Sequence, residues 1–487
     1  MMRQGRMTPG RARAIATISI GLALAGGACR GDGLIDLSET FDAEIVTPDT
    51  TMLVNEVGVF RAVATYTFGL GAPTQISWGI SDTSKAFLVV RPDLTATVSP
   101  IDTGEVRVVA VINGAFTDSV TLTIVRAGFV RWRQNVAGAV TLNPAIGADS
   151  NIRAVHGTTL STRTPSGELL QTTESCNGRL GPSVSIDNDA YVTGANCTRR
   201  HTADGVGVWA HQSGGLGLAV ARDSGAVVLA GDTVIRLSKL GAVVWSDTLG
   251  GSARTAPVVH SNGDIYVAWS AGANADSVSQ IAGDGTVNWT VGVPGVPDYA
   301  SPAIVGGSVV FSHPGGLFAV DATGAITWER VFAADNAAAT DSAPTSSPVL
   351  DGAGTIFVLT SDALYSYSAT GQIIWYADSL GYGTPTTGVG APTLLSNGTV
   401  LVPCQSPTAP AVREVCNVEG EDGGLVWRSA FGSGTVEGVV VGREGTVIAM
   451  RTRAGGGGEI AGVWSRLRLE PLGWPTEGGS ERRTRRK

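Results

Sequence analysis

The sequence predicts an all-β protein: an eight-bladed β-propeller preceded by a small immunoglobulin-like β-sandwich. One short motif, a glycine followed four residues later by tryptophan, occurs seven times, and an eighth copy carries glutamine instead. Successive copies lie 39, 38, 36, 44, 39, 47 and 52 residues apart, which is typical of four-stranded blades rather than helical solenoids. The 66 glycines and 16% charged residues also favour short strands joined by tight turns.

The N-terminal residues predict export. Residues 1–13 are basic, residues 14–25 are apolar, and small residues lead directly to Cys29, an order that predicts a signal peptide over residues 1–28. A cysteine in this position resembles the lipobox of bacterial lipoproteins, and the resemblance implies that Cys29 is lipidated and anchors the chain to the outer membrane. Gly26 stands where that family has an aliphatic residue, so ordinary cleavage after Ala28 remains the alternative.

The charge balance argues against nucleic acid as a partner. The formal net charge is -8, and removing residues 1–28, which carry four arginines and no acid, leaves 30 basic against 42 acidic residues, or -12. Such a surface repels phosphate backbones. Residues 471–487 run against this balance, because their last six residues include five basic ones, and we expect them to form a disordered basic tail.

The segment between the signal peptide and the repeats predicts a tether and a sandwich. Residues 29–43 are polar and show little alternation, so we expect a tether. Residues 44–126 contain runs of period-two alternation, which predict a β-sandwich. The strand ending in Trp78, the following Ser81-Asp82 and the Gly104 turn resemble bacterial immunoglobulin-like domains of the group 2 type. That resemblance implies a spacer or an adhesive module with Trp78 in its core.

Residues 128–470 are expected to form the propeller. Six units carry a proline at the first residue of a strand, where it costs no ladder bond, and we expect the tryptophans to pack between neighbouring blades. These structural tryptophans are Trp132, Trp209, Trp245, Trp289, Trp328, Trp375 and Trp427, with Gln171 in the remaining position. Strands at 438–441, 446–450 and 462–469 follow the last copy, and the strand 128–132 is expected to join them, closing the eighth blade and removing both exposed edges.

Four cysteines follow Cys29. Their even number suits an oxidising compartment, and their proximity favours the disulfides Cys176–Cys197 and Cys404–Cys416. Closing loops of this length is worth about 3 kcal/mol in the chain-entropy model. Spacings of 21 and 12 residues match no zinc pattern, so no metal site is expected.

No catalytic constellation is visible. The five histidines fall in different repeats, and the chain lacks a nucleophile elbow, a phosphate-binding glycine loop and a His-Glu-x-x-His motif. The nearest acidic cluster, Asp187-Asn188-Asp189, is expected to form a turn. We therefore assign no catalytic residue, expect no cofactor, and leave open any residue that would bind one.

The repeats resemble the pyrroloquinoline-quinone-type propeller repeat, as in Asp321-Ala322-Thr323-Gly324 followed by Trp328. That family contains quinoprotein dehydrogenases and also non-enzymatic lipoproteins, including the propeller subunit of the outer-membrane β-barrel assembly machinery. The family's alcohol dehydrogenases carry an adjacent cysteine pair against a calcium-bound quinone. This chain has no Cys-Cys dipeptide and no dense cluster of oxygen ligands for calcium.

The resemblance implies an exported, lipid-anchored, non-enzymatic protein of the cell envelope. Its propeller would be a scaffold that binds envelope or outer-membrane proteins, or an envelope polymer. Two alternatives stay open at this point. One is a quinone-dependent periplasmic dehydrogenase with a divergent site, and the other is a carbohydrate-binding or adhesive surface protein.

Overall fold

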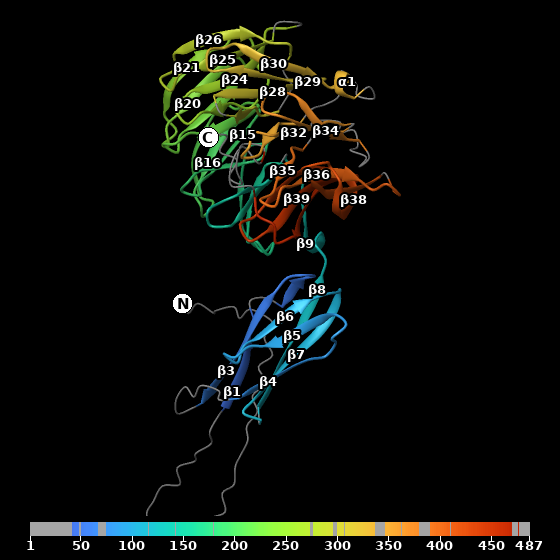
Figure 1. Ribbon diagram of the computed structural model, residues 1–487. Helices are drawn as coiled ribbons and strands as arrows, with labels where there is room; N and C mark the ends of the chain where they lie inside the picture. The colour runs from blue at the N-terminus through green and yellow to red at the C-terminus, as the bar shows by residue number, and fades with distance from the viewer. Residues whose placement is uncertain are drawn as a thin grey trace, which may run out of the picture. The chain divides into compact units, whose positions relative to one another are not determined.

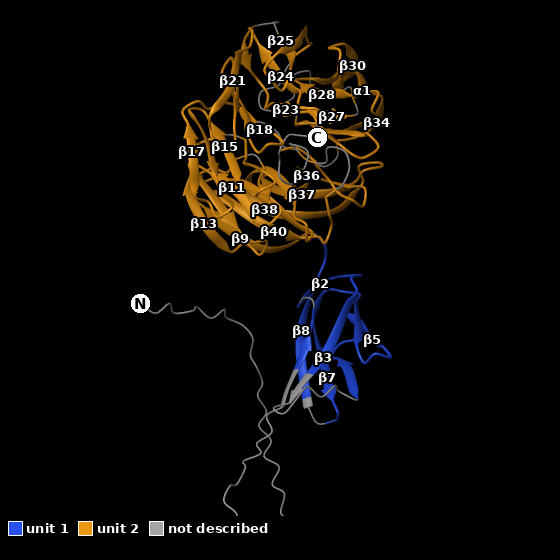
Figure 2. Cartoon of the chain, turned by 90° about the vertical axis from the view of Figure 1, so that its left-hand side faces the viewer, with its two compact units in different colours: residues 1–127 blue, residues 128–487 orange. Residues whose placement is uncertain are grey.

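The computed structural model describes residues 41–47, 50–66, 75–114, 116–141, 143–178, 180–272, 276–295, 300–305, 307–336, 346–361, 363–378, 390–409, 411–469 and 476. The predicted signal peptide, the lipidation site Cys29 and, apart from residue 476, the predicted tail lie outside these residues. The chain divides into two compact units, residues 1–127 and 128–487 (Figure 2). No helix among the described residues is long and apolar enough to cross a membrane.

Unit 1 is built from two four-stranded sheets, in the orders β1-β3-β6-β5 and β2-β8-β7-β4. Its strands are β1 (Phe41–Val46), β2 (Thr51–Leu53), β3 (Gly58–Tyr66), β4 (Ile76–Ile80), β5 (Ala86–Val90), β6 (Ala96–Pro100), β7 (Gly104–Ile112) and β8 (Phe116–Val125). Buried residues of both sheets, including Phe60 and Val108, form one core, and Trp78 packs against it. Strand β1 begins before residue 44, so part of the predicted tether is strand.

Unit 2 holds the repeats (Figure 1). Its elements are β9 (Phe129–Val136), β10 (Ala145–Ile146), β11 (Ile152–His156), β12 (Thr159–Arg163), β13 (Leu169–Glu174), β14 (Ser183–Val184), β15 (Ala190–Gly194), β16 (Cys197–His201), β17 (Gly207–His211), β18 (Gly217–Val220), β19 (Ala226–Ala230), β20 (Thr233–Leu237), β21 (Val243–Thr248), β22 (Ser252–Ala253), β23 (Val258–Val259), β24 (Ile265–Ser270), β25 (Asp276–Ile281), β26 (Val287–Gly292), β27 (Ala303–Val305), β28 (Ser308–His313), β29 (Gly316–Asp321), β30 (Ile326–Val331), α1 (Phe332–Asp335), β31 (Val349–Leu350), β32 (Ile356–Leu359), β33 (Leu364–Tyr367), β34 (Ile373–Ala377), β35 (Thr393–Leu394), β36 (Thr399–Gln405), β37 (Val412–Glu419), β38 (Leu425–Val441), β39 (Thr446–Arg453) and β40 (Gly458–Trp464). The predicted all-β class is confirmed.

These strands form antiparallel groups that we number in chain order. Groups 1 to 6 are the sheets β10–β13, β14–β17, β18–β21, β22–β26, β27–β30 and β31–β34. The remaining seven-stranded sheet comprises two groups, because β38 pairs with β37 through its first half and with β39 through its second. Group 7 is β35, β36, β37 and the first half of β38, and group 8 is the second half of β38 with β39, β40 and β9.

Group 8 is completed by the first strand of the unit. Strand β9 pairs antiparallel with β40, so a strand before the array joins three strands at its end (Figure 2). The sequence places the third of these strands at 462–469, which is wrong. It runs from Gly458 to Trp464, because Gly456 and Gly457, both with positive φ, already make the turn after β39.

The groups follow one another around a ring. A short strand near the start of each group lies against one of the next group: β10, β14, β18 and β23 are in contact in turn, and so are β27, β31, β35 and β38. The backbone N–H of Val439 in group 8 donates a 3.0 Å hydrogen bond to Oδ1 of Asn143, just before group 1. This bond joins the two ends of the array.

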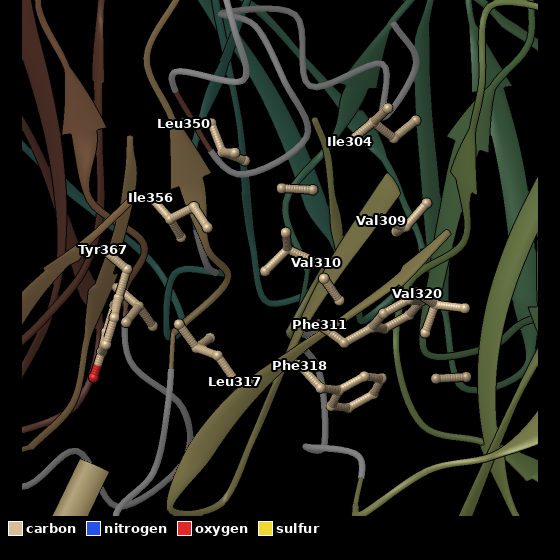
Figure 3. Packing of buried hydrophobic residues seen from close by; sticks show 14 of the residues in the cluster. Ile304, Val309, Val310, Phe311, Leu317, Phe318, Val320, Leu350, Ile356 and Tyr367 are labelled. Atoms are coloured by element: carbon tan, nitrogen blue, oxygen red, sulfur yellow. The ribbon is translucent and has the colours of Figure 1, made fainter. Parts of the chain in front are cut away.

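The hydrophobic core lies between neighbouring groups. In the cluster drawn in Figure 3, Phe311 and Phe318 of group 5 share a core with Leu350, Ile356 and Tyr367 of group 6. Equivalent clusters lie between other neighbours, and partly buried tryptophans pack against them. Each sheet is therefore stabilised by its neighbours rather than by its own two faces.

Candidate functional site

The predicted tryptophans lie at the junctions between groups. Each one packs against the motif glycine of the next copy; the pairs are Trp132–Gly167, Trp209–Gly241, Trp245–Gly285, Trp289–Gly324, Trp328–Gly371, Trp375–Gly423 and Trp427–Gly128. All of these glycines have φ between 75 and 97°, which the turn requires and which favours glycine. The repeat motif is therefore an inter-group contact, with glycine and tryptophan of one copy serving two different junctions.

Most of the indole rings also donate hydrogen bonds across the junction. Six of them donate from Nε1 to a backbone carbonyl in the turn that contains the next glycine, over 3.0 to 3.2 Å. At the one junction that has no tryptophan, between groups 1 and 2, the side chain of Gln171 faces Gly205. The predicted structural role of the tryptophans is thus tied to specific partners.

A β-bulge precedes every one of these positions. In group 6, Tyr367 pairs with Ile373 and Ser366 with Trp375, which leaves Ile374 as the extra residue. The bulge turns the tryptophan inward and leaves the residue before it unpaired in the ladder. The bulged residues in groups 1 to 8 are Leu170, Val208, Val244, Asn288, Thr327, Ile374, Val426 and Arg131.

The bulged residues divide into two chemical classes. In groups 1, 2, 3, 6 and 7 they are apolar, and their exposures lie between 42% and 60%. In groups 4, 5 and 8 they are polar or charged. We call the apolar ones, Leu170, Val208, Val244, Ile374 and Val426, the outer belt. In groups 1 to 6 they or their polar counterparts lie on the last strand of the sheet, which pairs on one side only.

Sequence reasoning missed the outer belt. A signal for it exists, since an apolar residue directly before an inward-facing tryptophan breaks the alternation expected of a half-buried strand. Exposed apolar side chains on unpaired strand edges are suited to contact with another polypeptide.

The four cysteines form the disulfides that the sequence favours. Cys176 is joined to Cys197 and Cys404 to Cys416, with Cα–Cα distances of 5.8 and 5.9 Å. The second bridge lies within group 7, between β36 and β37. The first bridge does not staple a single blade, because Cys176 follows β13 of group 1 and Cys197 begins β16 of group 2.

The acidic cluster lies in the turn between β14 and β15, as predicted, and its side chains serve other turns. Asn188 accepts a 2.6 Å hydrogen bond from the backbone of Ala148 in group 1, and Asp187 accepts one from Lys239 of group 3 at 2.7 Å. Asp189 binds Arg200 of β16 at 2.5 Å, and both of these side chains are more than nine-tenths buried. The cluster is structural, and the Asp189–Arg200 pair carries no sequence signal.

Two shallow hollows lie on the side of the ring that carries these turns. One, about 290 Å³, lies between the β18–β19 and β23–β24 turns and is lined by Arg222, Asp223, Arg236 and His260 among others. The other, about 260 Å³, occupies the equivalent place between groups 6 and 7. Both lie at the lower end of the ~300–1,000 Å³ range of typical ligand pockets or just below it.

The histidines do not converge on a site. Burial lowers the pKa of His156, His201 and His313, and that of His201 falls to about 4, so these buried rings are neutral near pH 7. They belong to three different groups. In the described part of the chain, the group of side chains placed to hold a metal is Cys404, Glu414 and Cys416, in which the two sulfurs are already bonded to each other.

Comparison with known proteins agrees with this architecture. Residues 197–366 match the family model described as "Outer membrane protein assembly factor BamB". No curated protein matches the chain. The resemblance to pyrroloquinoline-quinone-type repeats that the sequence indicates is therefore confirmed for the central groups.

Solved structures show the same fold at low sequence identity. Quinohemoprotein alcohol dehydrogenase ADHIIG from Pseudomonas putida HK5 matches with a TM-score of 0.53 and 11% identity over 70% of this chain and 76% of its own. A europium-containing methanol dehydrogenase matches with a TM-score of 0.50 and 10% identity over 69% and 93%. A computationally designed protein gives 0.50 and 16% over 68% and 98%. These likenesses confirm the predicted propeller fold.

Proposed function

Because the chain is a propeller with pyrroloquinoline-quinone-like repeats, we propose that it is a non-enzymatic scaffold of the cell envelope that binds extended segments of envelope proteins. The outer belt carries this proposal. Its apolar side chains point away from the core at the unpaired margin of the sheets, where a partner strand with alternating apolar residues can bury them. The match to a family described by outer-membrane protein assembly supports this class of partner.

The bulges are consistent with reversible binding of a partner strand. A bulge interrupts the regular hydrogen-bonding edge, which limits uncontrolled strand addition between copies of the chain. The apolar side chains remain available, so recognition rests on side chains more than on a long backbone ladder. Weak contacts at several groups together would hold an extended chain by multivalency.

A peptide-binding experiment tests the proposal. A labelled peptide with alternating apolar and polar residues, of the kind that forms strands of outer-membrane barrels, should bind the wild-type chain in a fluorescence anisotropy assay. The double variant Val244→Lys/Ile374→Lys should weaken binding about tenfold or more, since each lysine replaces buried apolar contact with a charge. The matched variant Asn288→Lys/Thr327→Lys adds the same charge at polar bulges and should bind as wild type. Equal effects of both double variants would contradict the assignment of the outer belt as the peptide-binding surface.

We further propose that Cys29 is lipidated and holds the protein at the outer membrane, with an immunoglobulin-like unit 1 acting as spacer. Membrane fractionation of the wild type and of Cys29→Ala tests this part. The wild type should sediment with outer membranes, and the variant should be released in soluble form. Recovery of both in the soluble fraction would leave the protein exported but not anchored.

The two alternative functions would involve ligands other than a protein, namely a carbohydrate or a quinone. A carbohydrate-binding protein would retain envelope glycans on an array, and its binding would be insensitive to lysines in the outer belt. A quinone-dependent dehydrogenase shares the fold of the solved neighbours, but that likeness concerns the fold alone.

A further inference from the structure

The junction between groups 1 and 2 differs from the others around the ring. Gln171 occupies the tryptophan position there, and its amide Nε2 is buried without a hydrogen-bond partner among the described residues. Elsewhere an indole ring fills the space beneath the motif glycine. This junction therefore lacks the indole contact and the indole hydrogen bond that six other junctions have, although buried residues of both groups, such as Val155 and Val192, still pack together there.

A disulfide bond and an ion pair lie at this same junction. The disulfide joins Cys176, two residues after β13 of group 1, to Cys197 of group 2. Arg199, on the same strand as Cys197, pairs with the carboxylate of Glu174 at 2.9 Å and donates to its backbone carbonyl at 3.3 Å. The other disulfide lies inside group 7, whose junctions have tryptophan on both sides.

The two disulfides also differ in accessibility. Cys197 is partly exposed, whereas Cys404 and Cys416 are 2% and 0% exposed. Thiol–disulfide exchange requires a thiolate to reach one sulfur in line with the bond. Because Cys197 is partly exposed while Cys404 and Cys416 are buried, we expect a reductant that acts on the folded chain to reach this disulfide before the one in group 7.

We infer that Cys176–Cys197 is a redox-sensitive latch that replaces the missing tryptophan contact, and that a dithiol reductant opens it selectively in the folded protein. One thiolate of the dithiol attacks the sulfur of Cys197, the disulfide bond breaks, and Cys176 leaves as a thiolate that takes up a proton. The second thiol then displaces Cys197 as a thiol, and the dithiol is oxidised to a disulfide. Two electrons pass to the protein, and the junction keeps its non-covalent contacts, among them the Arg199–Glu174 pair and the Ala148–Asn188 hydrogen bond.

The consequence of opening is local. Strand β13 loses its covalent tie to group 2 while groups 2 to 8 keep their tryptophan contacts. Because β13 carries Leu170 of the outer belt, reduction loosens one end of that surface. This inference does not depend on the proposed function, since it concerns the junction itself.

Reduction of the wild-type chain tests the inference without any variant. The folded protein is treated with graded dithiothreitol, free thiols are alkylated, and the modified cysteines are identified by peptide mass spectrometry. We expect Cys176 and Cys197 to be modified about tenfold faster or more than Cys404 and Cys416. In parallel, hydrogen exchange should accelerate in β13 and β16 and stay unchanged in groups 4 to 7. Equal rates for both disulfides, or reduction without faster exchange at this junction, would overturn it.

Two variants sharpen the result. Gln171→Trp supplies the ring that the other junctions have, with the carbonyl of Ala203 in the turn before Gly205 as acceptor, and should suppress the increase in hydrogen exchange upon reduction. Cys404→Ser/Cys416→Ser removes the other disulfide and should leave the response of β13 to dithiothreitol unchanged. If Gln171→Trp gives the same increase as the wild type, the disulfide does not substitute for the tryptophan.

Discussion

The indole ring of Trp328 lies directly against Gly371, the motif glycine of the following copy. A Cβ atom on Gly371 would lie 2.6 Å from Cδ2 of Trp328, and the indole Nε1 donates to the carbonyl of Ala369 at 3.2 Å. The same relationship recurs around the ring. Because the tryptophan leaves no room for a side chain at the motif glycine, substituting this glycine tests directly how the groups are held together.

Gly371→Ala should destabilise unit 2 by about 2 to 4 kcal/mol, because overpacking against Trp328 adds to the strain of alanine at a φ of 75°. Gly398→Ala is the matched control. Its φ is 83° and a Cβ there meets nothing within 4 Å, so only the conformational cost of about 1–2 kcal/mol remains. Chemical denaturation followed by tryptophan fluorescence measures both. Equal losses would mean that the contact with Trp328 adds nothing.

Asp189→Ala should cost about 3–5 kcal/mol, because it leaves the guanidinium of Arg200 buried without its counter-charge. The double variant Asp189→Leu/Arg200→Met should lose less than the single one, since no buried charge remains. Asp187→Ala, in the same turn, breaks a pair whose side chains are 47% and 42% exposed and should cost about 1 kcal/mol or less. Thermal and chemical denaturation of the three variants measures their order of stability. A double variant less stable than Asp189→Ala would contradict this prediction.

The stability of unit 2 should fall as the pH drops from about 6.5 to about 4. Burial holds the pKa of His201 at about 4, with Arg199 adding to the effect, whereas the unfolded chain takes up a proton near 6.5. Within this window the unfolded state binds more protons, so protonation favours unfolding by roughly 3 kcal/mol in total. His201→Gln should flatten this part of the profile in denaturation measured at several pH values. An unchanged slope in the variant would show that other groups cause it.

Added pyrroloquinoline quinone and calcium should leave the absorbance spectrum of the protein unchanged, and no dye-linked alcohol oxidation should follow. The reason is that the sequence contains no adjacent cysteine pair, which the family's alcohol dehydrogenases carry against the quinone. The measurement is a titration of purified protein followed by an activity assay with a panel of alcohols. A saturable spectral shift would move the protein to the dehydrogenase class.

Much of the architecture was predictable because its signals are local. The spacing of the glycine–tryptophan motif marks the strands, and Asn-Gly pairs such as those at Gly263 and Gly398 mark turns that require positive φ. The disulfide pairing followed from proximity along the chain. The closing strand was predictable in outline, but its partner was misplaced, since the glycine run after β39 gives no signal of where the turn ends.

The all-β repeat architecture, the cysteine pairing and the lack of a recognisable catalytic motif could be inferred from the sequence alone. The tertiary structure decided which glycine each tryptophan contacts, that Cys176–Cys197 bridges two groups, and that the bulged residues form an outer belt. It also decided the Asn143–Val439 bond, whose partners are 296 residues apart. The physical reason is that strands and turns follow from local periodicity and backbone preference, whereas contacts between sheets depend on how the whole ring closes.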